Sequence, residues 1–159
     1  MAVDAAVREL LSKMLAWEEA HVGFEAAVAN IAPEMRGKQP AGLPYSPWQL
    51  VEHLRSAQHD ILDFCRNPHY KALNWPDDYW PSSPVPPSAS AWDDSLDGFK
   101  RDRQALQQLA ADPKIDLMVR IPHGDGQTYL REILLAADHA AYHIGQLVAV
   151  RRLLGIWKA

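Results

Sequence analysis

Two histidines one helical turn apart are the residues of this sequence best suited to chemistry. His139 and His143 are four positions apart, so on a helix they project from one side, one above the other. Two imidazoles in this arrangement can hold one metal ion, as in zinc-binding helices with two histidines at this spacing. The spacing fits equally well a pair of core histidines that each make an ordinary hydrogen bond, and the pair alone leaves both interpretations open.

A third histidine lies at the margin of another predicted helix face. His53 falls about 60° from the centre of the apolar stripe that surrounds it, which places it at the edge of the core. A third imidazole from a neighbouring helix would complete three protein ligands. Three ligands and an open water position are typical of catalytic sites for zinc-like metals, whereas a fourth protein ligand indicates a structural site.

Other polar residues are expected to have supporting or inert roles. His21 occupies an apolar-stripe position, so it should point inward; we interpret it as a core histidine outside the ligand set, with a fourth ligand or a general base as alternatives. Asp60, Glu132 and Gln146 are candidates to accept hydrogen bonds from ligating imidazoles. Cys65, the single cysteine, excludes an internal disulfide and is interpreted as a buried, inert thiol. The other histidines are expected at the surface or in loops: His59, His69 and His123.

Four segments with apolar residues at steps of three and four predict the helices that carry these residues. They span residues 3–31, 46–66, 90–112 and 128–154. Ser46 with Gln49, and Ser90 with Asp93, have the spacing of capping boxes at the start of the second and third helices. The last helix is apolar most of the way round, which is typical of a central helix. The sequence therefore predicts an all-α fold, a four-helix bundle.

The segment 66–90 between the second and third predicted helices is rich in proline and aromatic residues. Its prolines exclude a helix over most of its length, and Trp75, Tyr79 and Trp80 are too apolar for a free linker. We expect an ordered crossover over one end of the molecule, whose 75–80 stretch roofs a substrate pocket, forms a packing patch or makes a dimer contact. A short β-like run, 117–119, precedes the last helix.

Composition narrows the function classes. The chain of 159 residues has a net charge of −4, which argues against a nucleic-acid partner because phosphate binding needs a basic patch. The length fits a single domain, 1–159. No signal peptide is apparent, and the most apolar stretch, 133–150, is interrupted by Asp138, His139 and His143, so no membrane segment is expected. We expect a cytoplasmic protein.

Two motifs resemble the DinB-like superfamily of bacterial four-helix bundles, which includes thiol-dependent transferases of the YfiT type. They are SPWQLVEHL at 46–54 and DHAAYHIGQL at 138–147, and the ending 148–157 is also similar. The resemblance implies a divalent metal held by His53, His139 and His143. It also implies an enzyme that uses a low-molecular-weight thiol, such as bacillithiol or mycothiol, and a homodimer.

Together these observations lead to the hypothesis of a metal-dependent enzyme acting on a small molecule. Zn²⁺ or Ni²⁺ would bind the three histidines with water at the open position, and the reaction would be thiol transfer to an electrophile or hydrolysis. One alternative is a non-enzymatic module that binds a metal or ligand. The other is a plain structural bundle, in which each inward histidine makes an ordinary hydrogen bond and no metal binds.

Overall fold

The chain folds into helices joined by irregular segments. The structure, a computed structural model, describes residues 2–158, so Met1 and Ala159 at the ends of the predicted domain lie outside it. Its helices are α1 (Ala2–Met14), α2 (Phe24–Val28), α3 (Pro47–Arg66), α4 (Ala91–Ala111) and α5 (Tyr129–Leu153), with a 3-10 turn at Pro33–Met35. The predicted all-α bundle is confirmed. No strand occurs between residues 2 and 158: the β-like run 117–119 forms turns.

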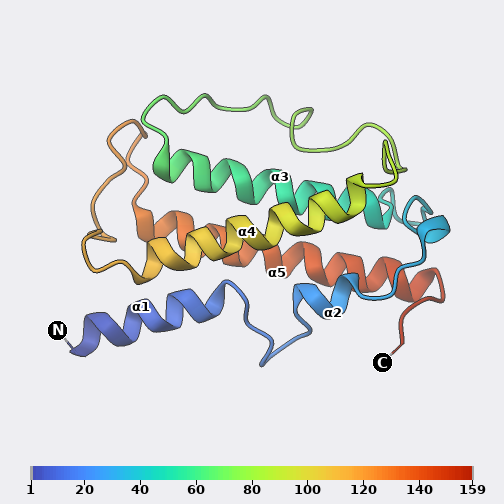
Figure 1. Cartoon of the computed structure of the whole chain (residues 1–159), viewed down its shortest axis with the longest axis horizontal. Coiled ribbons are helices and arrows are strands. Elements are labelled where there is room, and N and C mark those ends of the chain that lie inside the picture. The colour runs from blue at the N-terminus through green and yellow to red at the C-terminus, as the bar shows by residue number, and fades with distance from the viewer. Residues whose placement is uncertain (1, 159) are drawn as a thin grey trace.

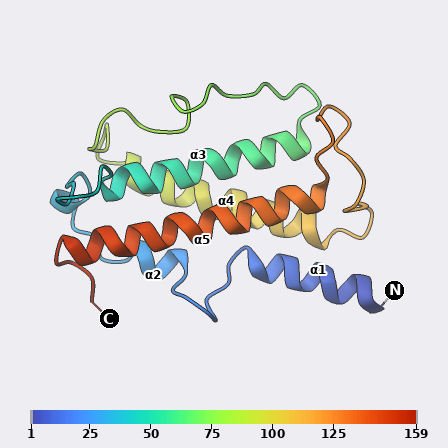
Figure 2. The same ribbon diagram turned by 180° about the vertical axis from the view of Figure 1, so that it is seen from behind.

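The four long helices lie side by side (Figures 1 and 2). α3 packs against both α4 and α5, α1 packs against α4, and α2 packs against α5. As predicted for the last helix, α5 is central, because it contacts each of the other four helices. α5 is also the one helix of the described chain long and apolar enough to cross a membrane by length and composition, a property that core helices share.

The segment between α3 and α4 runs along the length of α3, rather than over one end as predicted (Figure 1). The cause is the direction of the helices: α3 and α4 are parallel, so the chain must return to the starting end before α4 begins. A helix of 20 residues, the length of α3, is about 30 Å long. The proline-rich crossover spans this length in extended form and brings its aromatic residues alongside α3.

The single helix predicted over 3–31 is wrong. The chain leaves the helix after Met14, turns, and begins α2 at Phe24, with Gly23 as an extended N-cap. α1 packs mainly on α4 and α2 packs on α5, so the two pieces have different main neighbours. The break lets the Phe24 ring stack on Phe99 of α4, with ring centroids 4.1 Å apart.

The helix starts agree in part with the predicted caps. At α3, Ser46 Oγ accepts from the Gln49 backbone N–H and the Gln49 side chain accepts from the Ser46 N–H, which confirms the capping box. At α4 the predicted box is absent: Ser90 has helical backbone angles and makes no side-chain cap. Ser88 Oγ instead accepts the Ala91 N–H. Thr128 caps α5 by accepting from the Arg131 N–H.

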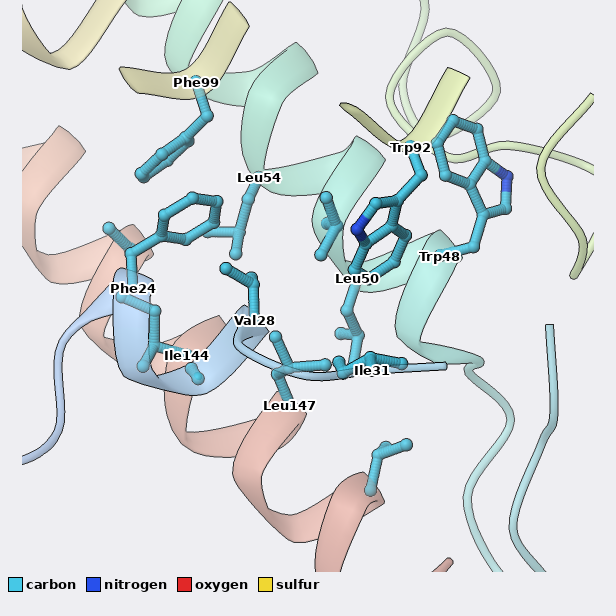
Figure 3. Close-up of a cluster of buried hydrophobic side chains, with 14 residues drawn as sticks. Phe24, Val28, Ile31, Trp48, Leu50, Leu54, Trp92, Phe99, Ile144 and Leu147 are labelled. Carbon is cyan, nitrogen blue, oxygen red and sulfur yellow. The ribbon is translucent and has the colours of Figure 1, made fainter. Parts of the chain in front are cut away.

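Two clusters of buried apolar side chains fill the bundle. One lies between α2, α3, α4 and the second half of α5, around Phe24, Leu50, Leu54 and Phe99 (Figure 3). The other joins α1 to the opposite ends of α3, α4 and α5. This packing sets the register of α3 against α5, and with it the relative positions of the histidines on the two helices.

Candidate metal centre

The three predicted metal ligands meet between α3 and α5. His53 Nε2 lies 3.0 Å from His139 Nε2 and 3.1 Å from His143 Nε2. One ligand atom from each of the three residues lies within 4.8 Å of the others. His53 and His143 are buried, and His139 is half-buried, so solvent reaches the group from the side of His139.

The partners of two rings determine which nitrogens face the centre with a lone pair. His53 Nδ1 lies 3.0 Å from the carbonyl oxygen of Tyr79, which can only accept, so this nitrogen carries the proton. His143 Nδ1 lies 2.7 Å from Gln146 Oε1 and donates to it in the same way. In a neutral imidazole the other nitrogen is then an acceptor. Both Nε2 atoms therefore direct lone pairs at each other, with no hydrogen to place between them.

Burial keeps these rings neutral. Desolvation lowers the pKa of His53 from 6.5 to about 3, with smaller contributions from the neighbouring His143 and His139. It lowers the pKa of His139 to about 4, again mainly by burial and then by His143. The pKa of His143 is lowered for the same reason. At neutral pH all three side chains are uncharged, which is the form that binds metals.

The geometry fits a divalent cation. Two nitrogens that each bind zinc at 2.0–2.1 Å in a tetrahedral arrangement lie about 3.3 Å apart, a few tenths of an ångström more than the two distances from His53. Two facing lone pairs are unfavourable unless a cation lies between them, so the plain structural interpretation leaves the contact of His53 with His143 unexplained. Three imidazoles with one open side match the donor set of a catalytic site.

Within the 75–80 stretch, Trp80 packs on this centre and Trp75 remains exposed. The Trp80 ring stacks on the His53 ring, with centroids 3.7 Å apart and planes at 7°, and Tyr45 stacks on Trp80 at 4.5 Å. Trp75 is 71% exposed and lines an open groove of 680 Å³ together with Tyr45, Pro76 and Trp80. The stretch thus covers one side of the centre and forms a groove beside it.

Of the three predicted hydrogen-bond acceptors, one contacts a histidine of the cluster. Gln146 accepts from His143, as expected. Asp60 instead accepts from the hydroxyl groups of two tyrosines, and buried Glu132 pairs with Arg131 at 2.7 Å. Asp60 and Glu132 line a separate cavity of 280 Å³. Each lies seven residues from a histidine of the cluster along its helix, about 10 Å at 1.5 Å per residue, which is too far for a direct bond.

The remaining candidates lie outside the centre. His21 was predicted to point inward, but it is exposed and its Nδ1 contacts the Val22 carbonyl oxygen at 2.9 Å. The break after α1 removes it from the helix face on which the prediction depended. His59, His69 and His123 are exposed, as expected. Cys65 is buried, and desolvation raises the pKa of its thiol to about 12, in agreement with an inert cysteine.

Sequence reasoning missed the partner of His53. It is a backbone carbonyl, that of Tyr79, and a carbonyl has no signature in the residue type. The clustering of aromatic residues at 75–80 was the available signal, and it indicated that the stretch is packed without indicating where. The stacking of Trp80 on His53 follows from the path of the crossover along α3.

Comparison with known proteins identifies a family for the chain but no individual relative. No curated protein and no solved structure matches the chain. The family model of the DinB superfamily matches residues 16–147, which include all three clustered histidines, the whole of α3 and α5 as far as Leu147. With a match over most of its length, the chain belongs to the DinB superfamily.

Proposed function

We propose that this protein is a metal-dependent enzyme in which His53, His139 and His143 bind one Zn²⁺ or Ni²⁺ ion. The observation that carries the proposal is the contact of His53 Nε2 with His143 Nε2 at 3.1 Å, in which both nitrogens are acceptors. A cation removes the repulsion between two such lone pairs and uses both. Neutral imidazoles, two of them with their tautomers already set, bind a metal with little reorganisation.

The reaction is transfer of a low-molecular-weight thiol to an electrophilic small molecule, or a related hydrolysis. A bound divalent ion lowers the pKa of a thiol or water at its open position and so supplies a nucleophile at neutral pH. The residues of the chain hold the centre in place: the Tyr79 carbonyl and Gln146 orient two imidazoles, and Trp80 excludes water from one side of His53. Membership of the DinB superfamily supports the choice of a thiol.

Metal analysis of protein prepared without a histidine tag tests the first part of the proposal. We expect about one ion per chain, and loss of the ion in His139→Ala with the helical circular dichroism retained. His69→Ala, which removes an exposed histidine outside the centre, is the matched control and should keep the ion. A metal-free wild-type protein after growth and purification with added Zn²⁺ or Ni²⁺ would refute metal binding.

Turnover tests the second part. The metal-loaded protein is assayed with a panel of low-molecular-weight thiols and electrophiles and with a panel of activated esters and amides. We expect turnover that disappears in His139→Ala. Tight metal or ligand binding without turnover across both panels would show that the protein is a non-enzymatic binding module rather than an enzyme.

The protein is further proposed to act as a soluble cytoplasmic homodimer. Large apolar side chains on the outer face of α5 support self-association: Leu134, Tyr142 and Leu153 are 39%, 63% and 59% exposed. Exposed apolar surface of this kind favours protein–protein contact. Light scattering coupled to gel filtration distinguishes a dimer from the monomer mass of 17.9 kDa.

A further inference from the structure

Asp60 joins two aromatic residues of the crossover to α3. Its Oδ1 accepts from the Tyr70 hydroxyl at 2.9 Å, and its Oδ2 accepts from the Tyr79 hydroxyl at 2.7 Å. Both oxygens of the carboxylate thus hold the segment 70–79 from one point on the helix. Hydrogen bonds to a charged acceptor are stronger than those between neutral groups.

Tyr79 is bonded at both of its polar ends. Its side-chain hydroxyl donates to Asp60, and its backbone carbonyl accepts from His53 Nδ1 at 3.0 Å. Asp60 and His53 are seven residues apart on α3, two helical turns on the same side. The phenol of Tyr79 therefore fixes the backbone of the same residue against the helix that carries His53.

The next residue reinforces this connection. Trp80 stacks on the His53 ring, with planes at 7°, so a shift of Tyr79 would move both the acceptor of His53 Nδ1 and the ring that covers it. The segment 67–90 has no regular secondary structure, and its position depends on such side-chain bonds. Burial and the bonds to Asp60 raise the pKa of Tyr70 to about 12 and raise that of Tyr79 as well, so both hydroxyl groups remain protonated donors.

We propose that Asp60 is a positioning residue for the metal centre, which acts through Tyr79 to hold His53 in the tautomer that directs Nε2 at His139 and His143. The expected effect of Asp60 on metal affinity rests on the function proposed above. The tautomer of His53 is a property of the metal-free protein and can be measured without any metal.

The test compares four single variants and the double variant Asp60→Asn/Tyr79→Phe. Asp60→Asn and Asp60→Ala weaken or remove the acceptor, Tyr79→Phe removes the one donor that leads to His53, and Tyr70→Phe removes the other donor. Ser56→Ala is the matched control, because Ser56 Oγ also fastens the crossover to α3, by donating to the Asp78 carbonyl at 3.4 Å. Circular dichroism selects the Asp60 variant that remains folded for the measurements that follow.

The first measurement is long-range ¹H–¹⁵N correlation of the histidine rings in metal-free protein. Wild type and Ser56→Ala should show His53 protonated at Nδ1, and Asp60→Asn and Tyr79→Phe should show a mixture with the Nε2–H tautomer. A general loss of stability would not move this ratio in folded protein. His53 fully protonated at Nδ1 in both variants would overturn the proposal, as would an equal change in Ser56→Ala.

The second measurement is zinc affinity by competition with a chelating dye. Partners of ligand histidines typically contribute 10–100-fold to metal affinity, and we expect about a 10-fold loss in Asp60→Asn and in Tyr79→Phe, with a smaller loss in Tyr70→Phe. Because Asp60 acts through Tyr79, the double variant should lose no more than the larger single loss. Additive losses would overturn the connection through Tyr79. A wild type that shows the tautomer and binds no zinc would refute the metal function alone.

Discussion

Acidification of the metal-free protein should weaken the fold through the buried histidines. The pKa values of His53 and His139 are about 3 and about 4 in the folded chain, against 6.5 for an unperturbed side chain. A histidine with a lowered folded pKa contributes stability above its unfolded pKa, and this contribution decreases as the pH falls from 6.5 towards the folded value. The unfolded chain binds protons in this window and the folded chain does not.

The size of the effect follows from these values. Between pH 7 and pH 5, each of the two histidines should reduce the free energy of unfolding by about 2 kcal/mol, about 4 kcal/mol together. Carboxylates with ordinary pKa values near 4 change little over the same interval. The total is a large fraction of the roughly 5–15 kcal/mol by which typical domains are stable.

Urea unfolding followed by circular dichroism measures this difference directly. The protein is freed of metal with a chelator and unfolded at pH 7 and at pH 5. In His139→Gln the loss of stability on acidification should be smaller by about 2 kcal/mol, whereas His69→Gln, an exposed position, should behave as wild type. A wild-type stability that is equal at the two pH values would refute the assignment of both rings as buried and neutral.

Three further predictions concern single residues. Gln146→Leu removes the acceptor of His143 Nδ1 and should lower zinc affinity by about 10–100-fold, measured by chelator competition. Gln146→Glu keeps an acceptor and should retain most of the zinc affinity. An unchanged affinity in Gln146→Leu would contradict the role of Gln146. Ser46→Ala removes the α3 capping box and a bond to the Pro84 carbonyl and should cost about 1–2 kcal/mol of unfolding free energy in urea; the same substitution at Ser90, which makes no cap, should cost less. The Cys65 thiol, with a pKa of about 12, should resist a thiol-specific disulfide reagent at pH 8 in the folded protein and react in urea; rapid reaction of the folded protein would show that the thiol is accessible.

Much of the local structure could be predicted because it depends on neighbours in the sequence. Ser46 and Gln49 marked the start of α3, and the predicted start of the last helix at residue 128 coincides with its N-cap, Thr128. Capping depends on side chains within one turn, so such signals are visible without the fold. The predicted box at Ser90 was wrong because Ser88, two residues earlier, supplies the acceptor, and the spacing alone did not distinguish the two serines.

The break between α1 and α2 could not be read from periodicity. Apolar residues continue at steps of three and four through the break, although Val7, Leu10 and Trp17 of this pattern are exposed in the folded chain. Each piece packs mainly on a different neighbour, α4 for α1 and α5 for α2, and neither neighbour is close in the sequence. His21 shows the consequence: its position in the pattern indicated the core, and the turn between the two helices places it at the surface.

The sequence by itself determined that His139 and His143 share one side of a helix, since 3.6 residues per turn is a local property. Only the tertiary structure decided that His53 meets them, because the register of α3 against α5 depends on side chains that pack between distant segments. The same holds for the tautomer of His53, which depends on a backbone carbonyl 26 residues away. A carbonyl is common to every residue, so its position becomes visible once the path of the crossover is known.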